Sequence, residues 1–182
     1  LETLLNLLLS LLVRRKIKTQ FGSNLIAFVS GGGPLDSQIG NTLNALGIKT
    51  LQGYGLTETS PVVSCNPLTN IKVETVGTVL PNVEVKLAED GEILVRGEIL
   101  MIGYWNNKEA TDEIIKDGWL HTGDIGVFDS DNYLIITDRK KDIIVSSGGD
   151  NISPSKLENL LTLDAKIEQA CVFGDNKSYI SA

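Results

Sequence analysis

The stretch "NLIAFVSGGGPLDSQIGNTLNALGIKTLQGYG", residues 24–55, decides the fold class. Its apolar start predicts a short strand that runs into a glycine turn at residues 31–33. Residues 35–46 have a helical spacing of apolar side chains and stop at Gly47, a residue type that often follows a helix end. Residues 49–55 predict a second strand. A strand, a helix and a strand in this order predict a parallel sheet with helices, the α/β class.

The hydrophobic period changes to about two between Ile71 and Gly103, which predicts antiparallel β structure. Asp90-Gly91 lies between two alternating runs and therefore predicts a hairpin. Residues 107–142 predict a short helix and then strands joined at residues 129–132. Next come a strand, a glycine-rich loop and a helix with Pro154 in its first turn. Residues 166–175 predict one more strand, and another begins before Ala182.

A chain of 182 residues accommodates one domain, or one domain and part of another. The charged run "DRKKD", residues 138–142, lies between two expected strands and marks the best candidate boundary. We therefore divide the chain into residues 1–140, the later part of a large domain, and residues 141–182, a hinge and an incomplete small domain. The chain also begins without a methionine, so we expect it to be a segment of something longer.

The composition, 42% hydrophobic and 21% charged, is that of a soluble globular protein. A net charge of -7 argues against a nucleic-acid-binding surface, and two cysteines fit a reducing compartment such as the cytoplasm. The apolar run at residues 4–13 is far shorter than the roughly 20 residues that span a bilayer. Basic residues follow this run, whereas a signal peptide has them first. A buried helix with a solvated basic end is favoured over a membrane-surface helix.

The motif "GYGLTET", residues 53–59, combines a bare backbone with an aromatic ring, hydroxyls and one carboxylate. The ring of Tyr54 could stack on a base, and Thr57 could donate a hydrogen bond to a phosphate. Glu58 is the kind of hard oxygen ligand that Mg²⁺ takes singly, with phosphates and water completing its shell. A plain strand end with Thr57 as a helix cap would show the same residues, and the motif alone does not decide between the two interpretations.

Two further motifs have both a structural and a binding interpretation. "SGGGP", residues 30–34, would let a ligand approach the backbone, but alone it favours a tight turn, and it lacks the Lys-Ser/Thr of a phosphate loop. In "WLHTGD", residues 119–124, the carboxylate of Asp124 could hold both hydroxyls of a ribose or simply cap its own turn. His121 is the only histidine, and its surroundings in the sequence favour a structural role.

The segment "TDRKKDIIVSSGGDNISP", residues 137–154, combines a charged run with a second glycine-rich loop. Arg139 could reach the same ribose or a phosphate. Charged runs are usually solvated turns, but the place of this one at the expected domain boundary makes a hinge a second interpretation.

In this order, "SGGGPL", "QGYGLTETSP", "GEILVRG", "GYWNN", "DGWLHTGD" and "DRKKDIIVSSGGDNISP" resemble the adenylate-forming superfamily. That superfamily contains acyl-CoA synthetases, peptide-synthetase adenylation domains and firefly-type luciferases. The resemblance covers nearly the whole chain, and "QGYGLTETSPVVS" is most similar to bacterial long-chain fatty-acyl-CoA ligases. It implies that a fatty acid and ATP form acyl-adenylate with Mg²⁺, after which coenzyme A displaces AMP.

The resemblance also implies a role for individual residues. The adenine wall and nucleotide seat would comprise Gly32, Gly33, Pro34, Gly53, Tyr54, Gly55 and Leu56. Thr57 would hold the α-phosphate, Glu58 the Mg²⁺, and Asp124 with Arg139 the ribose hydroxyls. Lys141 matches the hinge position, and Gly148 and Gly149 match a loop that reaches the thiol tunnel in the second half-reaction.

Two family elements do not occur in the sequence: the phosphate-wrapping loop with its lysine, and the C-terminal lysine of the first half-reaction. We therefore expect the 182 residues alone to form no acyl-adenylate. An acyl-carrier protein as the thiol acceptor stays open, as do aryl or amino acids as substrates. A non-catalytic nucleotide-binding module and an interaction domain with vestigial motifs are also compatible with these residues. Fatty substrates leave peripheral contact with the inner membrane open as well.

Overall fold

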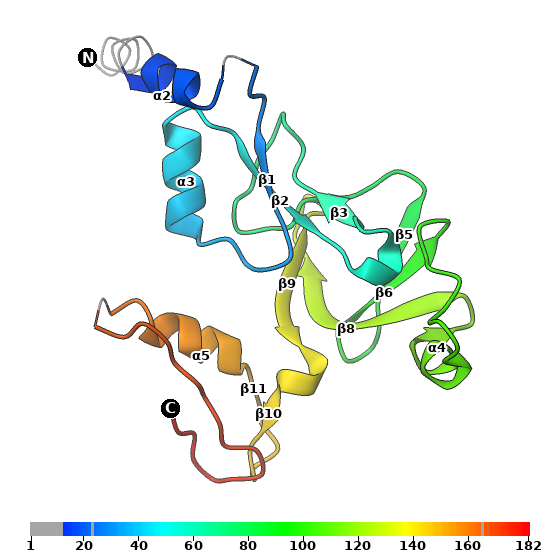
Figure 1. The fold of residues 1–182 in the computed structure, drawn as a ribbon. Coiled ribbons are helices and arrows are strands. Elements are labelled where there is room, and N and C mark those ends of the chain that lie inside the picture. The colour runs from blue at the N-terminus through cyan, green and yellow to red at the C-terminus, as the bar shows by residue number, and fades with distance from the viewer. Residues whose placement is uncertain (1–12, 23, 165) are drawn as a thin grey trace.

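The first sheet of the fold contains a parallel strand pair joined by a helix. The structure is a computed structural model and describes residues 13–22, 24–164 and 166–182. Strand β1 (Phe28–Ser30) pairs in parallel with β2 (Thr50–Tyr54), and α3 (Ser37–Ala45) connects them (Figure 1). The Asp36 carboxylate accepts a hydrogen bond from the Ile39 N–H and caps α3, and Gly47 follows the helix with a φ of 83°. This arrangement confirms the predicted strand, helix and strand.

Two short strands extend this sheet on the β2 side. Strand β3 (Ser64–Cys65) pairs antiparallel with β2, and β4 (Thr78–Val79) pairs antiparallel with β3. Between β2 and β3 lies the single-turn 3-10 helix η2 (Thr57–Thr59). The parallel pair is therefore small, and most of the pairing in the described residues is antiparallel.

A second, antiparallel sheet contains the remaining strands before residue 140. It comprises β5 (Val83–Leu87), β6 (Glu92–Gly97), β7 (Ile115–Lys116), β8 (Trp119–Phe128) and β9 (Leu134–Arg139). The predicted hairpin at Asp90-Gly91 joins β5 to β6, with Gly91 at a φ of 83°, and residues 129–133 join β8 to β9. The expected short helix is α4 (Lys108–Ile114), which the Asn107 side chain caps.

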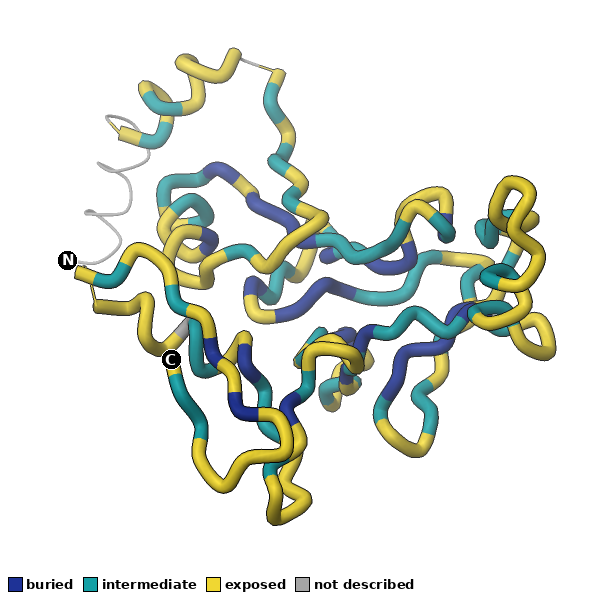
Figure 2. The backbone as a smooth tube through the Cα atoms, turned by 60° about the horizontal axis from the view of Figure 1, so that its bottom comes forward, coloured by how far each residue is buried: buried dark blue, intermediate teal, exposed yellow. Residues whose placement is uncertain are grey.

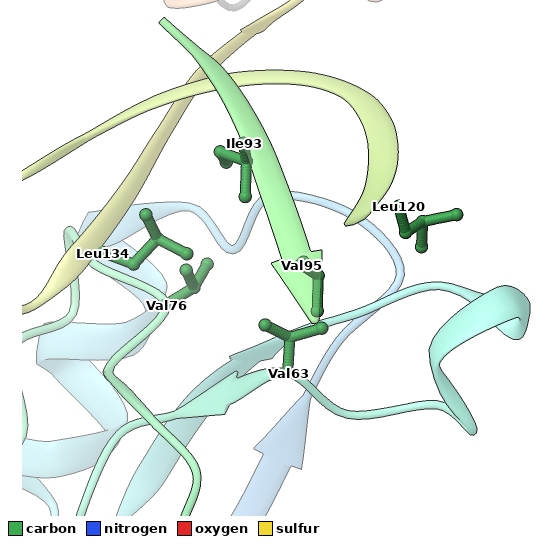
Figure 3. Packing of buried hydrophobic residues seen from close by; sticks show 6 residues of the cluster. All are labelled: Val63, Val76, Ile93, Val95, Leu120 and Leu134. Carbon is green, nitrogen blue, oxygen red and sulfur yellow. The ribbon is translucent and has the colours of Figure 1, made fainter. Parts of the chain in front are cut away.

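The two sheets share one hydrophobic core. Its buried side chains come from the segments around β3 and β4 and from β6, β8 and β9 (Figure 3). They are Val63, Val76, Ile93, Val95, Leu120 and Leu134. Because alternate residues of a strand face opposite sides, this core fixes the strand register and hence the positions of the polar side chains on the other face.

Two irregularities interrupt the pairing of β8. Against β6, Glu92 pairs with Ile125 and Leu94 with His121, so that residues 122–124 lie opposite the single residue Ile93. Against β9, Ile125 pairs with Asp138 and Gly126 with Ile136, which leaves Thr137 as an extra residue on β9. Bulges of this kind bend a strand and re-aim its side chains.

Beyond β9 the described chain forms small elements. The 3-10 turn η3 (Lys140–Asp142) leads to β10 (Ile144–Val145), which pairs antiparallel with β11 (Asn151–Ile152). Helix α5 (Pro154–Leu161) follows, capped by the Ser153 hydroxyl. This confirms the strand, the glycine-rich loop and the helix, while the domain boundary at residue 140 stays a prediction.

The strand expected at residues 166–175 was wrong in extent. Phe173 and Ser181 exchange two backbone hydrogen bonds of 2.9 Å, but they form a single isolated bridge. Gly174 allows the turn between them, since a Cβ there would lie 2.7 Å from the Tyr179 carbonyl oxygen. A β-propensity pattern needs a neighbouring strand to pair with over several residues, and here the pairing ends after one.

Helix α2 (Arg15–Gln20) contains the basic end of the first predicted helix. Arg15, Lys16 and Lys18 are exposed, as expected, and the Arg14 guanidinium donates to the Ala45 carbonyl at 2.9 Å. The apolar run before residue 13 lies outside the described residues. Within the described residues, no helix is long and apolar enough to cross a membrane.

Candidate nucleotide-binding site

The two glycine motifs lie side by side at the carboxyl ends of β1 and β2. The buried Gln52 side chain accepts a 2.8 Å hydrogen bond from the Leu35 N–H and ties the first loop to β2. A Cβ at Gly31 would lie 3.4 Å from the Gly53 carbonyl oxygen. Gly32, Gly33 and Pro34 are exposed beside this contact. The carboxyl end of a parallel pair is where open α/β sheets bind ligands, so the placement suits a nucleotide.

The turn after β2 is held from the inside by Thr59. Its hydroxyl is fully buried and accepts a 2.9 Å hydrogen bond from the Leu56 N–H. A Cβ at Gly55 would lie 1.7 Å from the Pro61 carbonyl oxygen, so the turn cannot accommodate any other residue there. Thr57 is exposed and Glu58 half-buried. The turn thus places the predicted phosphate and metal residues at the surface.

Glu58 is bound to the loop after β6. Its Oε1 accepts a 2.6 Å hydrogen bond from the Tyr104 hydroxyl, and its backbone carbonyl accepts one of 2.8 Å from the Met101 N–H. The hydrogen bond to the carboxylate raises the pKa of Tyr104 above its ordinary value. Tyr104 belongs to the motif "GYWNN", but its contact with Glu58 spans 46 residues and could not be inferred from that motif.

Asp124 is the centre of a buried polar cluster. Its Oδ2 accepts a 2.7 Å hydrogen bond from the Tyr54 hydroxyl, and its Oδ1 lies 3.0 Å from the Arg139 Nε. Asp124 is 3% exposed, whereas the Arg139 side chain is 55% exposed. Burial, above all, raises the pKa of Tyr54 beyond its usual range, so the hydroxyl stays a donor. Three motifs separated in the sequence therefore meet at one carboxylate.

Tyr54 contributes its hydroxyl to this cluster. Sequence reasoning assigned it only the stacking of its ring on adenine, and that assignment stays a prediction. The register explains the ion pair, because Asp124 lies directly opposite Arg139 in the β8–β9 ladder. Opposite charges at such facing positions stabilise a sheet.

Behind Asp124 lies a second buried carboxylate that sequence reasoning missed. Glu92 Oε1 accepts a 3.0 Å hydrogen bond from the Gly123 N–H, and Oε2 lies 2.9 Å from the Lys140 Nζ and 3.2 Å from the His121 Nδ1. Burial alone would raise the pKa of Glu92, but the hydrogen bonds from Lys140, His121 and Gly123 outweigh it and lower that pKa. Glu92 belongs to the motif "GEILVRG", and a charged residue within an apolar strand was the available signal.

The remaining predicted residues follow β9 in the chain. Lys141 is exposed in η3, and Gly148 and Gly149 are exposed in the turn between β10 and β11. Gly149 has a φ of 87°, which suits glycine in a tight turn. Figure 1 shows this hairpin far from β1 and β2. The structure thus brings together the nucleotide-binding candidates and separates the thiol-tunnel candidates from them.

Within the described residues, no group of three or more histidine, cysteine or acidic side chains could hold a metal ion. Glu58 provides one carboxylate, of which Tyr104 uses Oε1. Mg²⁺ is commonly held by one or two carboxylates while substrate phosphates and water complete its octahedron. The single carboxylate therefore fits a Mg²⁺ that arrives with a nucleotide, but does not fit a resident metal centre.

Comparison with known proteins decides the family. Residues 2–105, more than half of the chain, match the family described as AMP-binding enzyme. The chain belongs to this family. The match confirms the resemblance inferred from the order of the motifs, and it includes the segment from the glycine loop to the "GYW" motif.

Relatives of this chain include long-chain-fatty-acid–CoA ligase FadD15 of Mycobacterium bovis. The two are 45% identical over 171 residues, which are 94% of this chain and 28% of the relative. The long-chain-fatty-acid–CoA ligase of Salmonella typhimurium is 38% identical over 93% of this chain and 32% of its own length. The chain therefore spans less than a third of these ligases.

A solved structure supports the fold assignment of this chain. It is o-succinylbenzoate CoA synthetase (MenE) from Bacillus subtilis in complex with ATP and a magnesium ion. This structure superposes on the chain with a TM-score of 0.70, and the two sequences are 30% identical. The superposed part is 79% of this chain and 32% of the synthetase chain. The mixed α/β fold predicted from the sequence is thereby confirmed.

Proposed function

We propose that the protein containing this chain is an AMP-forming long-chain fatty-acid–CoA ligase. The observation that carries the proposal is the meeting of Tyr54, Asp124 and Arg139 from three separate motifs, in a chain 45% identical to a ligase of that name. The chain spans only part of that relative, so the proposal concerns the complete protein.

The proposed reaction has two balanced steps. A carboxylate oxygen of the fatty acid attacks the α-phosphorus of ATP, and pyrophosphate leaves. The thiol of coenzyme A then attacks the acyl carbonyl, AMP leaves, and the thiol proton passes to solvent or to a base. Neither step needs a protein nucleophile, because positioning and charge neutralisation provide most of the catalysis in such transfers.

Asp124 and Arg139 are proposed to bind the ribose. The two Asp124 oxygens have about four acceptor positions, of which Tyr54 and Arg139 use two. Arg139 covers the carboxylate and is half exposed, so its side chain is the one that moves aside or shares the contact when ribose hydroxyls arrive. The exposed Gly32, Gly33 and Pro34, with Tyr54, form the proposed adenine wall.

Thr57 and Glu58 are proposed to face the phosphates. Thr57 would donate to the α-phosphate, and Glu58 would hold the Mg²⁺, which would supply positive charge to neutralise the phosphates. Tyr104 orients the Glu58 carboxylate through Oε1 and leaves Oε2 as an acceptor. Gly53, Gly55 and Leu56 form the backbone around this seat.

The second half-reaction is assigned to the residues after β9. Lys141 would be the hinge, and Gly148 and Gly149 would approach the thiol tunnel after rotation. The exposure of these three residues, in contrast to the buried Asp124, supports a role in a different half-reaction. An acyl-carrier protein is the alternative thiol acceptor. The exposed basic residues of α2 are compatible with peripheral contact to the inner membrane of a cytoplasmic enzyme.

Fatty-acid-dependent ATP–pyrophosphate exchange by the complete protein tests the proposal. Short, medium and long fatty acids are compared with aryl and amino acids at saturating Mg²⁺. Exchange that peaks with long acids, followed by acyl-CoA formation, is the expected result. Exchange with aryl or amino acids alone would preserve the mechanism and overturn the substrate. ATP binding without exchange would favour a non-catalytic nucleotide-binding module.

A further inference from the structure

The segment of β8 that carries Asp124 leaves the regular ladder. Residues 122–124 lie opposite the single residue Ile93 of β6, so this segment cannot pair with β6 residue by residue. Gly123 has a φ of 71°, and a Cβ there would have no heavy atom within 4 Å. A bulge of this length needs other partners for its backbone groups.

Glu92 provides the main partner of the bulge. Its Oε1 accepts a hydrogen bond from the Gly123 N–H at 3.0 Å. Thr122, the residue before Gly123, is held separately, because its hydroxyl donates to the Ile93 carbonyl at 2.8 Å. Glu92 is 5% exposed and therefore held in place by its surroundings. The residue directly before Asp124 is thus fixed by a buried carboxylate.

The other oxygen of the same carboxylate binds the neighbour of Arg139. Glu92 Oε2 lies 2.9 Å from the Nζ of Lys140, the residue directly after Arg139, and His121 Nδ1 lies 3.2 Å from it. Asp90 adds a second acceptor for Lys140 at 2.6 Å. One buried side chain therefore fixes the chain next to both members of the Asp124–Arg139 pair.

We propose that Glu92 is a positioning residue that sets the Asp124–Arg139 pair for ribose recognition. The inference rests on the proposed function, in which that pair binds ribose hydroxyls. Glu92 does not touch the nucleotide; it holds Gly123 and Lys140, and its loss lets the bulge relax while the core strands on either side remain packed.

The experiment measures the ribose preference of the complete protein. Dissociation constants for Mg²⁺-ATP and Mg²⁺-2′,3′-dideoxy-ATP are determined by titration calorimetry for the wild type, Glu92→Ala and Glu92→Gln. The preference for ATP is expected to fall about tenfold in Glu92→Ala, because the buried Gly123 N–H loses its acceptor and Lys140 keeps only Asp90. Glu92→Gln keeps an acceptor for the Gly123 N–H and should lose less.

Glu84→Gln is the matched control. Glu84 is an exposed glutamate on β5, the strand next to β6, and its ion pair is with Arg96 and not with any residue of the Asp124 cluster. It should retain the full preference. In an Asp124→Ala background, Glu92→Ala should change the preference no further, since the two act on one contact. A purely structural role would weaken the binding of both nucleotides equally.

Each outcome decides the inference. The positioning role of Glu92 is overturned if Glu92→Ala weakens the binding of both nucleotides equally, so that the preference for ATP is unchanged. A wild type without any preference for ATP overturns it together with the ribose role of Asp124. A wild type that prefers ATP but exchanges pyrophosphate with no acid refutes the ligase proposal, while the preferences of the variants still decide the role of Glu92.

Discussion

The chain up to residue 139 and the chain after it differ in how their polar residues are held. Asp124 and Glu92 are almost fully buried, and each contacts partners far along the sequence. Lys141, Gly148 and Gly149 are exposed in short turns. Most residues after residue 140 are exposed or half-buried, and the tube that leads to the C-terminus in Figure 2 is largely yellow and teal.

This difference teaches that the two candidate sets need different physical support. Recognition of a ribose needs acceptors fixed to within a fraction of an ångström, which buried hydrogen bonds provide. A hinge must change its backbone dihedral angles and therefore has few tertiary contacts. Substitutions before and after residue 140 should accordingly have different kinetic signatures.

The largest expected effect is that of Asp124→Ala. The substitution leaves the Tyr54 hydroxyl and the Arg139 guanidinium without their acceptor and removes the proposed ribose contact. We expect kcat/KM for ATP in pyrophosphate exchange to fall about 1000-fold, because two or more charge-assisted hydrogen bonds are lost. Asp112→Ala, at an exposed aspartate of α4, should leave exchange unchanged. If Asp124→Ala showed near-normal exchange, the buried cluster around Asp124 would not be part of the nucleotide-binding site.

Glu58→Ala should come next and should separate activity from stability. Glu58 is bonded to Tyr104 but lies outside the buried core, so its loss removes a proposed metal ligand without opening a cavity. We expect the exchange rate to fall about 100-fold at saturating Mg²⁺ with an unchanged melting temperature. Glu109→Ala, an exposed glutamate of α4, serves as control. Full activity of Glu58→Ala would contradict the metal assignment.

Lys141→Pro examines the region after β9. Proline fixes φ and restricts the residue before it, so the turn η3 should lose its freedom to rotate. We expect exchange to stay within about twofold and thioester formation to slow about tenfold, as for a conformational step. Lys141→Ala keeps the backbone free and should spare both half-reactions. Equal losses in both half-reactions for the proline variant would argue against a hinge at this position.

The smallest effect concerns the contact between the two regions, Glu92 with Lys140. The pKa of Glu92 is lowered from its ordinary value of 4.5, so its stabilising contribution is complete above that value and is lost as the pH falls through the folded-state pKa. The pKa of Lys140 is raised from 10.5, so its contribution is complete below that value and is lost at higher pH. Because Lys140 is half exposed, solvent screens the pair.

We therefore expect Glu92→Gln to lower the free energy of unfolding by about 1 kcal/mol or less at neutral pH. The difference from the wild type, measured from urea midpoints, should shrink at pH 3 and again above pH 11. If the difference in unfolding free energy between Glu92→Gln and the wild type did not depend on pH, the Glu92–Lys140 ion pair would not stabilise the contact between the two regions.

Much of the fold could be predicted from the sequence because local signals agreed with it. The glycines at 47 and 91, the cap at Asn107 and the alternation of β5 and β6 each act over a few residues. The strand at residues 166–175 was overestimated, because a strand depends on a partner that local pattern does not reveal. The bulges of β8 and β9 were also invisible, since they arise from pairing.

The candidate site could be predicted in its members but not in its contacts. The motif order supplied Tyr54, Asp124 and Arg139, yet the hydrogen bond from Tyr54 to Asp124 spans 70 residues. Glu92 and Tyr104 lie in motifs that were recognised, but their roles depend on what the fold brings next to them. Chemistry can be inferred from residue types, whereas positioning requires the register.

The extra residue Thr137 of β9 has a consequence for insertions and deletions. If the pairing of Val127 with Ile135 continued without a bulge, Asp138 would lie opposite Asp124, and two carboxylates would repel each other across the ladder. Deleting Thr137 would straighten β9 and still leave Arg139 opposite Asp124. Inserting a residue beside Thr137 would instead require a wider bulge to keep the same pair. This part of β9 should therefore tolerate the loss of one residue better than the gain of one.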